Sequence, residues 1–216
     1  MKLNRKQKTL RNFLLAAALL LLWWVLTGMN PITPGQALRW QAQEWGLKET
    51  PRVVCRVKDG ARKANVVFTA DDRVGLARTE WNFIASSARI DCIRPKEETT
   101  LLHMAAGYEV ELFAYTQVPG AAEAECSVHI RSDINNQWFD ETYTMISPNL
   151  GSGVFAFPLE PKELKELTVQ DTAFLELSNI LRHGWDSFGG SYTITITFRD
   201  EAGTIIHTYE ERLEET

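Results

Sequence analysis

The sequence predicts a mainly β protein with one membrane helix at its N-terminus. A single uncharged apolar stretch occupies residues 13–29. Beyond residue 51 the hydrophobic pattern has a period of two, which is typical of half-buried strands, and turn-forming residues interrupt it at short intervals. We therefore expect a membrane helix, then a capped helix with a four-stranded antiparallel meander, then a seven-stranded immunoglobulin-like β-sandwich.

The apolar stretch from Phe13 to Met29 has the composition of a membrane-spanning helix. At about 1.5 Å per residue it would be roughly 25 Å long, close to a hydrocarbon core of about 30 Å. The best signal-cleavage candidate, residues 35–37, lies well beyond its end. We expect an uncleaved anchor, and the alternative is a secreted protein released by signal cleavage. Trp23 and Trp24 are expected at the membrane interface, where aromatic residues are enriched.

Charge predicts the topology of the chain. Residues 1–12 form a tail with five Lys or Arg side chains and no acid, and basic flanks stay on the cytoplasmic side. Everything after Pro31 should therefore lie outside the cytoplasm, in a single-pass cell-membrane protein of bacterial envelope type. Residues 13–216 carry 18 basic and 28 acidic side chains. This acidic balance argues against a nucleic-acid partner and against a polybasic grip on anionic lipid.

A second helix is expected to begin at Pro34. Thr33 can cap it, and Gln36 completes a Thr-x-x-Gln capping box. Gly46 suits the left-handed residue that ends a helix. The apolar face consists of Leu38, Ala42 and Trp45. We expect this face to pack on the protein itself; a membrane-surface or partner-binding helix is the alternative, which the lack of a basic rim disfavours.

Four short strands are expected after this helix, around residues 53–57, 66–69, 74–81 and 88–93. Tight turns between them predict an antiparallel meander, and the helix should cover one of its faces. Helix and meander together would form a unit over residues 30–95. Residues 96–103 are predicted as a linker, because the segment around Pro95 is charged and contains a proline.

The remaining residues, 104–216, are predicted to form the β-sandwich, because strand-like segments alternate there with turn chemistry. The antibody-type Cys…Trp…Cys pattern is absent, so the likeness is architectural. Residues 168–181 fit a strand and a helix almost equally, and we assign them to a strand. The seven segments are Tyr108–Val118, Glu125–Arg131, Gln137–Ile146, Gly153–Leu159, Leu167–Leu177, Ser191–Arg199 and Thr204–Arg212.

The last two segments predict a hairpin with a defined register. Residues 192, 194, 196 and 198 are apolar and alternate with polar ones, so they should form the buried face. Residues 200–203 suit a three-residue loop with a glycine bulge, which places Asp200 opposite Thr204. In that register Phe198 would face Ile206.

The three cysteines, Cys55, Cys92 and Cys126, lie in phase with apolar neighbours. We expect three buried, reduced thiols, with a Cys55–Cys92 bridge as the alternative. An odd cysteine count gives no disulfide framework, and no Cys or His spacing is typical of a metal site. No cofactor is predicted.

No catalytic motif is present in the sequence, and we predict no catalytic residue. The four histidines lack partners at a meaningful spacing and are expected on the surface. In the glycine-rich loop 182–190, the side chains of Trp185, Asp186 and Phe188 are candidate ligand or partner contacts. The alternative is that both rings fold back onto the end of the sandwich.

These observations predict a membrane-anchored extracytoplasmic binding or accessory module of the cell envelope. Its expected partners are the membrane, through the N-terminal helix, and either another envelope protein or a carbohydrate. Two alternatives stay open: an extracytoplasmic hydrolase with a site assembled from distant residues, and a structural subunit that docks to another envelope protein. The sequence does not identify the ligand or the oligomeric state.

Overall fold

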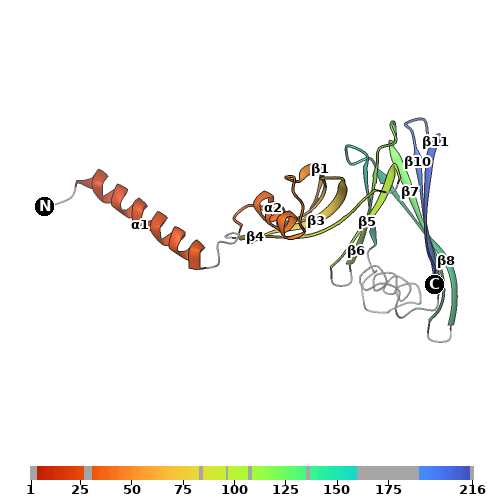
Figure 1. Ribbon diagram of the computed structural model, residues 1–216, viewed down its shortest axis with the longest axis horizontal. Coiled ribbons are helices and arrows are strands. Elements are labelled where there is room, and N and C mark those ends of the chain that lie inside the picture. The colour runs from red at the N-terminus through yellow and green to blue at the C-terminus, as the bar shows by residue number, and fades with distance from the viewer. Residues whose placement is uncertain are drawn as a thin grey trace.

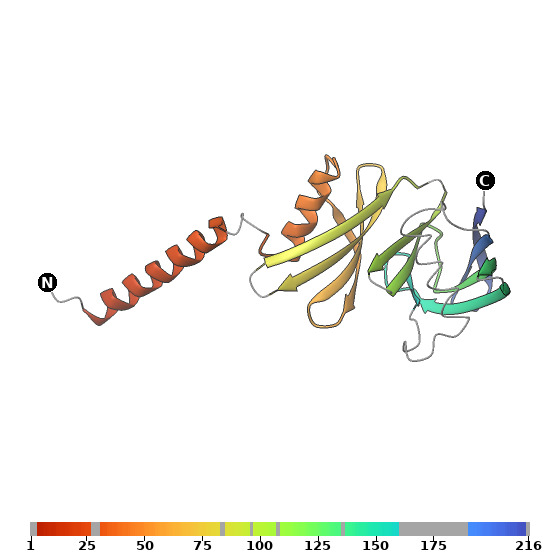
Figure 2. The same cartoon turned by 90° about the horizontal axis from the view of Figure 1, so that it is seen from below.

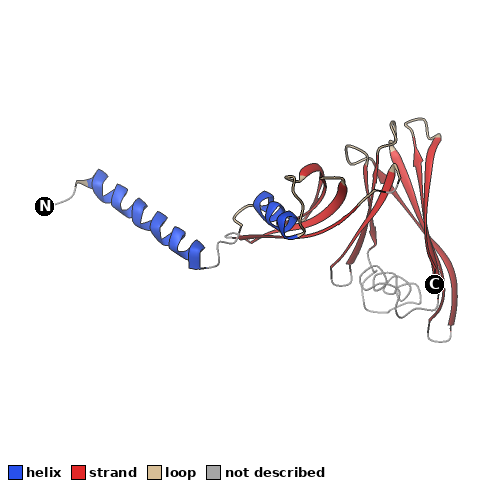
Figure 3. Ribbon diagram, viewed as in Figure 1, coloured by secondary structure: helices blue, strands red, loops and turns tan. Residues whose placement is uncertain are grey.

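The computed structural model describes residues 4–26, 31–82, 85–95, 97–106, 109–134, 137–159 and 190–214. Within these ranges the chain forms two helices and eleven strands, and every strand pairing is antiparallel (Figures 1 and 3). The prediction of a mainly β protein with an N-terminal apolar helix is therefore confirmed.

Helix α1 spans Arg5–Leu26 and is long and apolar enough to cross a membrane. Its 22 residues rise about 33 Å at 1.5 Å per residue, and the uncharged residues 12–26 account for about 22 Å of a hydrocarbon core of about 30 Å. The helix begins at Arg5, so the basic tail continues into it rather than ending before it. None of its apolar window is buried against the rest of the described chain, and Figure 1 shows it standing clear of the strands.

Helix α2 spans Pro34–Glu44 and has both predicted caps. The Thr33 hydroxyl accepts the backbone N–H of Gln36 at 3.3 Å, and the Gln36 side-chain oxygen accepts the backbone N–H of Thr33 at 3.2 Å. Gly46 has φ +74°, the left-handed conformation expected at a helix end. The predicted capping box and stop signal are confirmed.

The predicted apolar face of α2 is confirmed in part. Leu38 and Ala42 are buried, together with Ala37. Trp45 is 45% exposed, because it is the C-cap residue and lies beyond the last helical turn. The helix packs against strands β3 and β4 of the following sheet, as expected for a helix that packs on its own protein.

Sheet A is the predicted four-stranded meander. Its strands are β1 (Arg52–Asp59), β2 (Lys63–Ala70), β3 (Arg73–Asn82) and β4 (Ala85–Ile93), paired in chain order. Asp71, in the β2–β3 turn, ties this sheet to the segment after α2. Its carboxylate accepts the backbone N–H groups of Lys48 at 3.1 Å and Glu49 at 3.0 Å.

Two further sheets follow. Sheet B has the strand order β5-β6-β9, and sheet C has the order β11-β10-β7-β8. The bounds are β5 (Thr99–Ala106), β6 (Glu109–Thr116), β7 (Glu123–Ile134), β8 (Gln137–Pro148), β9 (Val154–Leu159), β10 (Gly190–Arg199) and β11 (Ile205–Glu214).

The described part of the body is a stack of four layers: helix α2, sheet A, sheet B and sheet C (Figure 2). One apolar cluster lies between α2 and sheet A, a second between sheets A and B, and a third between sheets B and C. Sheet B is therefore buried on both faces. In strand β6, Phe113 faces sheet A and Leu112 faces sheet C, and both are at most 1% exposed.

Sheets B and C pack face to face as a β-sandwich, but the predicted immunoglobulin-like arrangement and seven-strand count are not confirmed. Six of the seven predicted segments correspond to strands β6 to β11, and the segment Leu167–Leu177 lies outside the described residues. Strand β5 begins at Thr99, inside the range 96–103 that we predicted as a linker. The connection between β4 and β5 is thus Arg94–Glu98, and the division into domains stays a prediction.

The predicted hairpin register is right at the turn and wrong beyond it. Asp200 donates its N–H to Thr204 at 3.0 Å, and Gly203 has φ +79°, as expected. A bulge between Phe198 and Arg199 then shifts the pairing by one residue, so Phe198 pairs with His207 and not with Ile206. The shift turns His207 inward, where its ring stacks on Phe198 with centroids 5.8 Å apart. The predicted buried face of β10 is confirmed: residues 192, 194, 196 and 198 are fully buried.

All three cysteines are free thiols. Cys92 and Cys126 are buried, and burial raises the pKa of Cys126 to about 12. Cys55 is half-buried, and its thiol donates to the Leu150 carbonyl at 3.5 Å. The alternative Cys55–Cys92 bridge is excluded, because β1 and β4 are opposite edges of sheet A. Three inter-strand spacings amount to about 14 Å, whereas a disulfide needs Cα atoms within about 7 Å.

Candidate functional site

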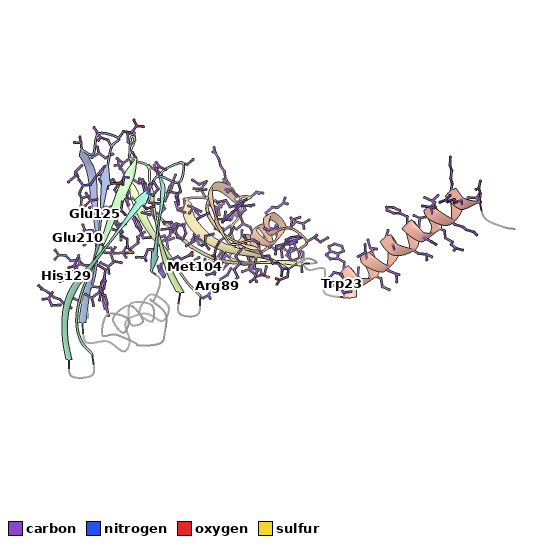
Figure 4. The ribbon with its side chains drawn as sticks, turned by 180° about the vertical axis from the view of Figure 1, so that it is seen from behind. Trp23, Arg89, Met104, Glu125, His129 and Glu210 are labelled. Atoms are coloured by element: carbon purple, nitrogen blue, oxygen red, sulfur yellow. The ribbon has the colours of Figure 1, made fainter. Side chains whose placement is uncertain are left out.

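The predicted contact residues Trp185, Asp186 and Phe188 lie in residues 160–189, outside the described part of the chain. Their role in recognition stays a prediction. Trp23 and Trp24 lie in the last turn of α1, and Figure 4 shows Trp23 at the helix end closest to the sheets. That placement suits the interface of a membrane-spanning helix, and the interfacial role of the two rings also stays a prediction.

His129 has a partner that sequence spacing did not indicate. Strand β7 carries His129 on the outer side of sheet C (Figure 4), and its Nε2 lies 2.7 Å from Oδ1 of Asp140 on β8. Arg131 contacts the other carboxylate oxygen at 3.3 Å. The hydrogen bond from His129 lowers the pKa of Asp140. Our expectation of a histidine without a partner was wrong here, because the β7–β8 pairing joins residues eleven positions apart.

His207 also differs from the surface residue that the sequence predicted. The bulge in β11 turns it toward Phe198, and its buried Nε2 has no hydrogen-bond partner among the described residues. Neither histidine lies in a metal site: no group of three His, Cys, Asp or Glu side chains in the described ranges could hold a metal ion. His183 lies outside the described residues.

The best-formed candidate site is an open cleft of about 580 Å³ at one end of sheet A, which we call the basic cleft. The segment that leads into α2 forms one wall, and the β1–β2 hairpin with the end of β3 forms the other. The lining residues are Ile32, Thr33, Pro34, Arg56, Lys58, Gly60, Ala61, Arg62, Lys63, Ala64, Thr79 and Trp81.

Local sequence explains how the hairpin presents its cations. Arg56 and Lys58 are two residues apart in β1, so they lie on the same face of the sheet. That face is the one covered by α2, because Arg56 pairs with Val66, which packs in the cluster beneath the helix. Gly60 has φ +74° and allows the tight turn that returns the chain into β2.

Two cations of the basic cleft have no acid partner. Arg56 and Lys58 form no ion pair within the described residues, whereas Lys63 lies opposite Asp59 and Glu80 in the strand register and on the other face of the sheet. The acid of the same hairpin, Asp59, pairs with Arg78 at 3.0 Å. The cleft therefore has an excess of positive charge that can attract an anion.

The basic cleft belongs to a positively charged section of the chain. Residues 31–95 carry 11 Lys or Arg and 7 Asp or Glu, whereas residues 96–216 carry 7 basic and 21 acidic side chains. Our prediction against the binding of anionic lipid rested on the net charge of residues 13–216 as a whole, which conceals this asymmetry. The cluster RVKDGARK, residues 56–63, was the sequence signal that could have revealed it.

The basic cleft lies close to the end of α1 along the chain. Only residues 27–30 separate Leu26 of α1 from Pro31, and five residue steps span at most about 18 Å. Ser86 then fixes the entering chain to β4: its N–H donates to the Pro31 carbonyl at 2.6 Å, and its hydroxyl donates to the Ile32 carbonyl at 3.1 Å. Sheet A is consequently the sheet nearest to α1 (Figure 2).

Chemically, the cleft suits the binding of an anion. Lys, Arg and Trp side chains supply charge, hydrogen-bond donors and an aromatic surface, and no nucleophile with an adjacent base lines the cleft. Comparison with known proteins does not assign a function to the cleft. No family model matches the chain, and no curated protein shows significant similarity to it.

Proposed function

We propose that the protein is a membrane-anchored binding or accessory module of the cell envelope, with its folded body outside the cytoplasm. The observation that carries this proposal is the layout of α1. Basic residues lie before α1 and in its first turns. The helix is long and apolar enough to cross a membrane, and a folded body follows it within a few residues. Basic residues at the N-terminal end favour a cytoplasmic tail and an exterior C-terminus.

The site chemistry favours binding over hydrolysis. The basic cleft offers unneutralised cations beside Trp81, which is 40% exposed. The His129–Asp140 pair lies on an outer strand face and contacts Arg131, and it includes no Ser, Thr or Cys nucleophile. The hydrolase alternative therefore gains no support from the described residues.

Docking to another envelope protein would be detected by affinity purification from solubilised membranes.

Protease digestion of intact cells tests the proposed topology. A C-terminal epitope should be lost when protease is added outside, after outer barriers are permeabilised, while a cytoplasmic control protein stays intact. The mass of the purified chain tests the anchor at the same time, because an uncleaved protein retains the α1 sequence. An epitope that survives until the membrane is lysed would contradict the proposed topology, and a chain that begins near residue 38 would show that it is secreted.

A further inference from the structure

We propose that the basic cleft binds the phosphate of anionic lipid headgroups in the same membrane that α1 anchors. This inference deepens the proposed function and rests on it for the anchoring of α1. It assigns a ligand class to the cleft, and with it a second attachment of the body to the bilayer surface.

The first step of the argument is charge. Arg56 and Lys58 lie on the face of sheet A that α2 covers and form no ion pair within the described residues, and Arg62 lines the same cleft. Phosphate oxygens accept hydrogen bonds from ammonium and guanidinium groups, so these cations suit the phosphate of an anionic lipid headgroup. Arg56 and Lys58 line one hollow, which a diffuse surface charge would lack.

The second step is position. The cleft is built partly from Ile32, Thr33 and Pro34, the first residues after the connection from α1. That connection reaches at most about 18 Å, and Ser86 holds Pro31 and Ile32 on sheet A. The connection therefore keeps the cleft near the bilayer and lets it approach to within one Debye length, about 8 Å at physiological ionic strength, over which the potential of anionic lipids acts.

The third step is the mixed chemistry of the cleft rim. Trp81 is 40% exposed and Ile32 is 49% exposed. Indole rings favour the headgroup level of a bilayer, because they combine an apolar face with an N–H donor. Cations beside an exposed indole and an exposed aliphatic side chain match a surface that presents phosphates above acyl chains.

The fourth step is the charge asymmetry of the whole body. The acidic section, residues 96–216, includes the strands of sheets B and C, which lie farther from α1 than sheet A does (Figure 2). An anionic bilayer attracts the basic layer and repels the acidic layers. Both effects orient the body with the basic cleft toward the lipid.

Hydrogen exchange on the full chain in lipid nanodiscs tests the proposal. Discs of phosphatidylcholine are compared with discs that contain one third phosphatidylglycerol by composition. Backbone amides of the β1–β2 turn, Gly60 to Arg62, should exchange about fivefold more slowly in the anionic discs, the effect expected when even one cation gains a lipid partner. The protection should disappear at 1 M salt, where the Debye length falls to about 3 Å.

Two charge-reversal variants provide the matched comparison. Arg56→Glu with Lys58→Glu should abolish the lipid-dependent protection. Lys48→Glu with Arg52→Glu makes the same change in net charge at the opposite end of β1, outside the cleft, and should retain it. If the first variant loses the slow exchange of core amides in β10, the milder Arg56→Gln with Lys58→Gln replaces it.

Equal exchange in the two disc types would overturn the proposal, and so would loss of protection in both variants. Soluble glycerol phosphate, added to the phosphatidylcholine discs, separates the two sources of phosphate. Protection by the soluble compound alone would overturn the lipid as the ligand. The hydrogen-exchange result does not depend on the cellular topology, because a nanodisc presents both bilayer surfaces. A protease digestion that contradicts the proposed topology would therefore not contradict lipid binding, and equal exchange in the two disc types would not contradict the topology.

Discussion

Asp71 illustrates how a single exposed side chain connects two segments distant in sequence. It sits in the β2–β3 turn with φ +53°, a left-handed conformation that Asp tolerates better than most residues. Its carboxylate accepts two backbone N–H groups from the segment after α2, and these hydrogen bonds lower its pKa. The ionised form is therefore the form that holds α2 and the turn together.

This lowered pKa predicts an acid-sensitive contribution to stability. Because the folded pKa lies below the unfolded value of about 3.9, the contribution is complete above that pH and is lost as pH falls through the folded pKa. Asp71→Asn keeps one acceptor oxygen but cannot titrate, so its urea-unfolding midpoint should fall less than that of the wild type between pH 5 and pH 3. Asp71→Ala should be less stable than Asp71→Asn at pH 7, since alanine resists positive φ and offers no acceptor. Identical pH dependence in wild type and Asp71→Asn would contradict the assignment.

At the scale of elements, the β10–β11 hairpin shows how a bulge overrides strand alternation. The loop has the predicted geometry, with the Asp200 carboxylate accepting the N–H groups of Ala202 and Thr204. The extra residue in β11 then brings His207 and Tyr209 to the inner side, and Tyr209 packs against the core between sheets B and C. Burying two rings favours the shifted register over one that would turn Ile206 and Thr208 inward.

Engineered cross-links distinguish the two registers. Thr195 pairs with Glu210 in the structure, whereas the unbulged register would pair it with Tyr209. We expect Thr195→Cys with Glu210→Cys to oxidise readily, because directly opposite side chains on one face have Cβ atoms about 5 Å apart. Thr195→Cys with Tyr209→Cys should stay reduced, since those side chains point to opposite faces. Peptide mass spectrometry after mild oxidation identifies the bond, and preferential closure of the second pair would show that the register is unbulged.

At the scale of the whole molecule, sheet B joins the parts that the sequence suggested were separate. Its inner strand β6 sends Phe113 into the cluster shared with sheet A and Leu112 into the cluster shared with sheet C. A boundary near residue 95 therefore separates two sections of chain without separating two cores. We infer that sheets A, B and C unfold together.

Replacing Phe113 with Ala tests this cooperativity. The ring is 1% exposed, and its loss should cost about 3–5 kcal/mol. Native-state hydrogen exchange should show equal loss of protection in β2 and in β10, on opposite sides of sheet B. Trp40→Ala, which removes a larger but 44% exposed ring, should change the protection of neither strand by more than about 0.5 kcal/mol. A loss confined to β2 or to β10 would mean that two units unfold independently.

The sequence shows some residues of the basic cleft but does not predict that they form a cleft. The run of cations at residues 56–63 is visible in the sequence, and so is the short connection after α1. Their meeting with Trp81 and Ile32 depends on the pairing of β1, β2 and β3 and on the contacts of Ser86. Strand pairing brings together residues that no spacing rule connects, which also explains why the partner of His129 was missed.

The sequence by itself determined the features that depend on neighbouring residues. Hydrophobic length defines α1, side-chain capping defines the start of α2, and period-two alternation defines strands such as β10 with its buried face. Only the tertiary structure decided which sheets share a core, where the bulge in β11 shifts the register, and which cations line one cleft. The physical reason is range: capping and alternation are satisfied within a few residues, whereas packing and strand pairing are chosen by the burial of surfaces far apart in the chain.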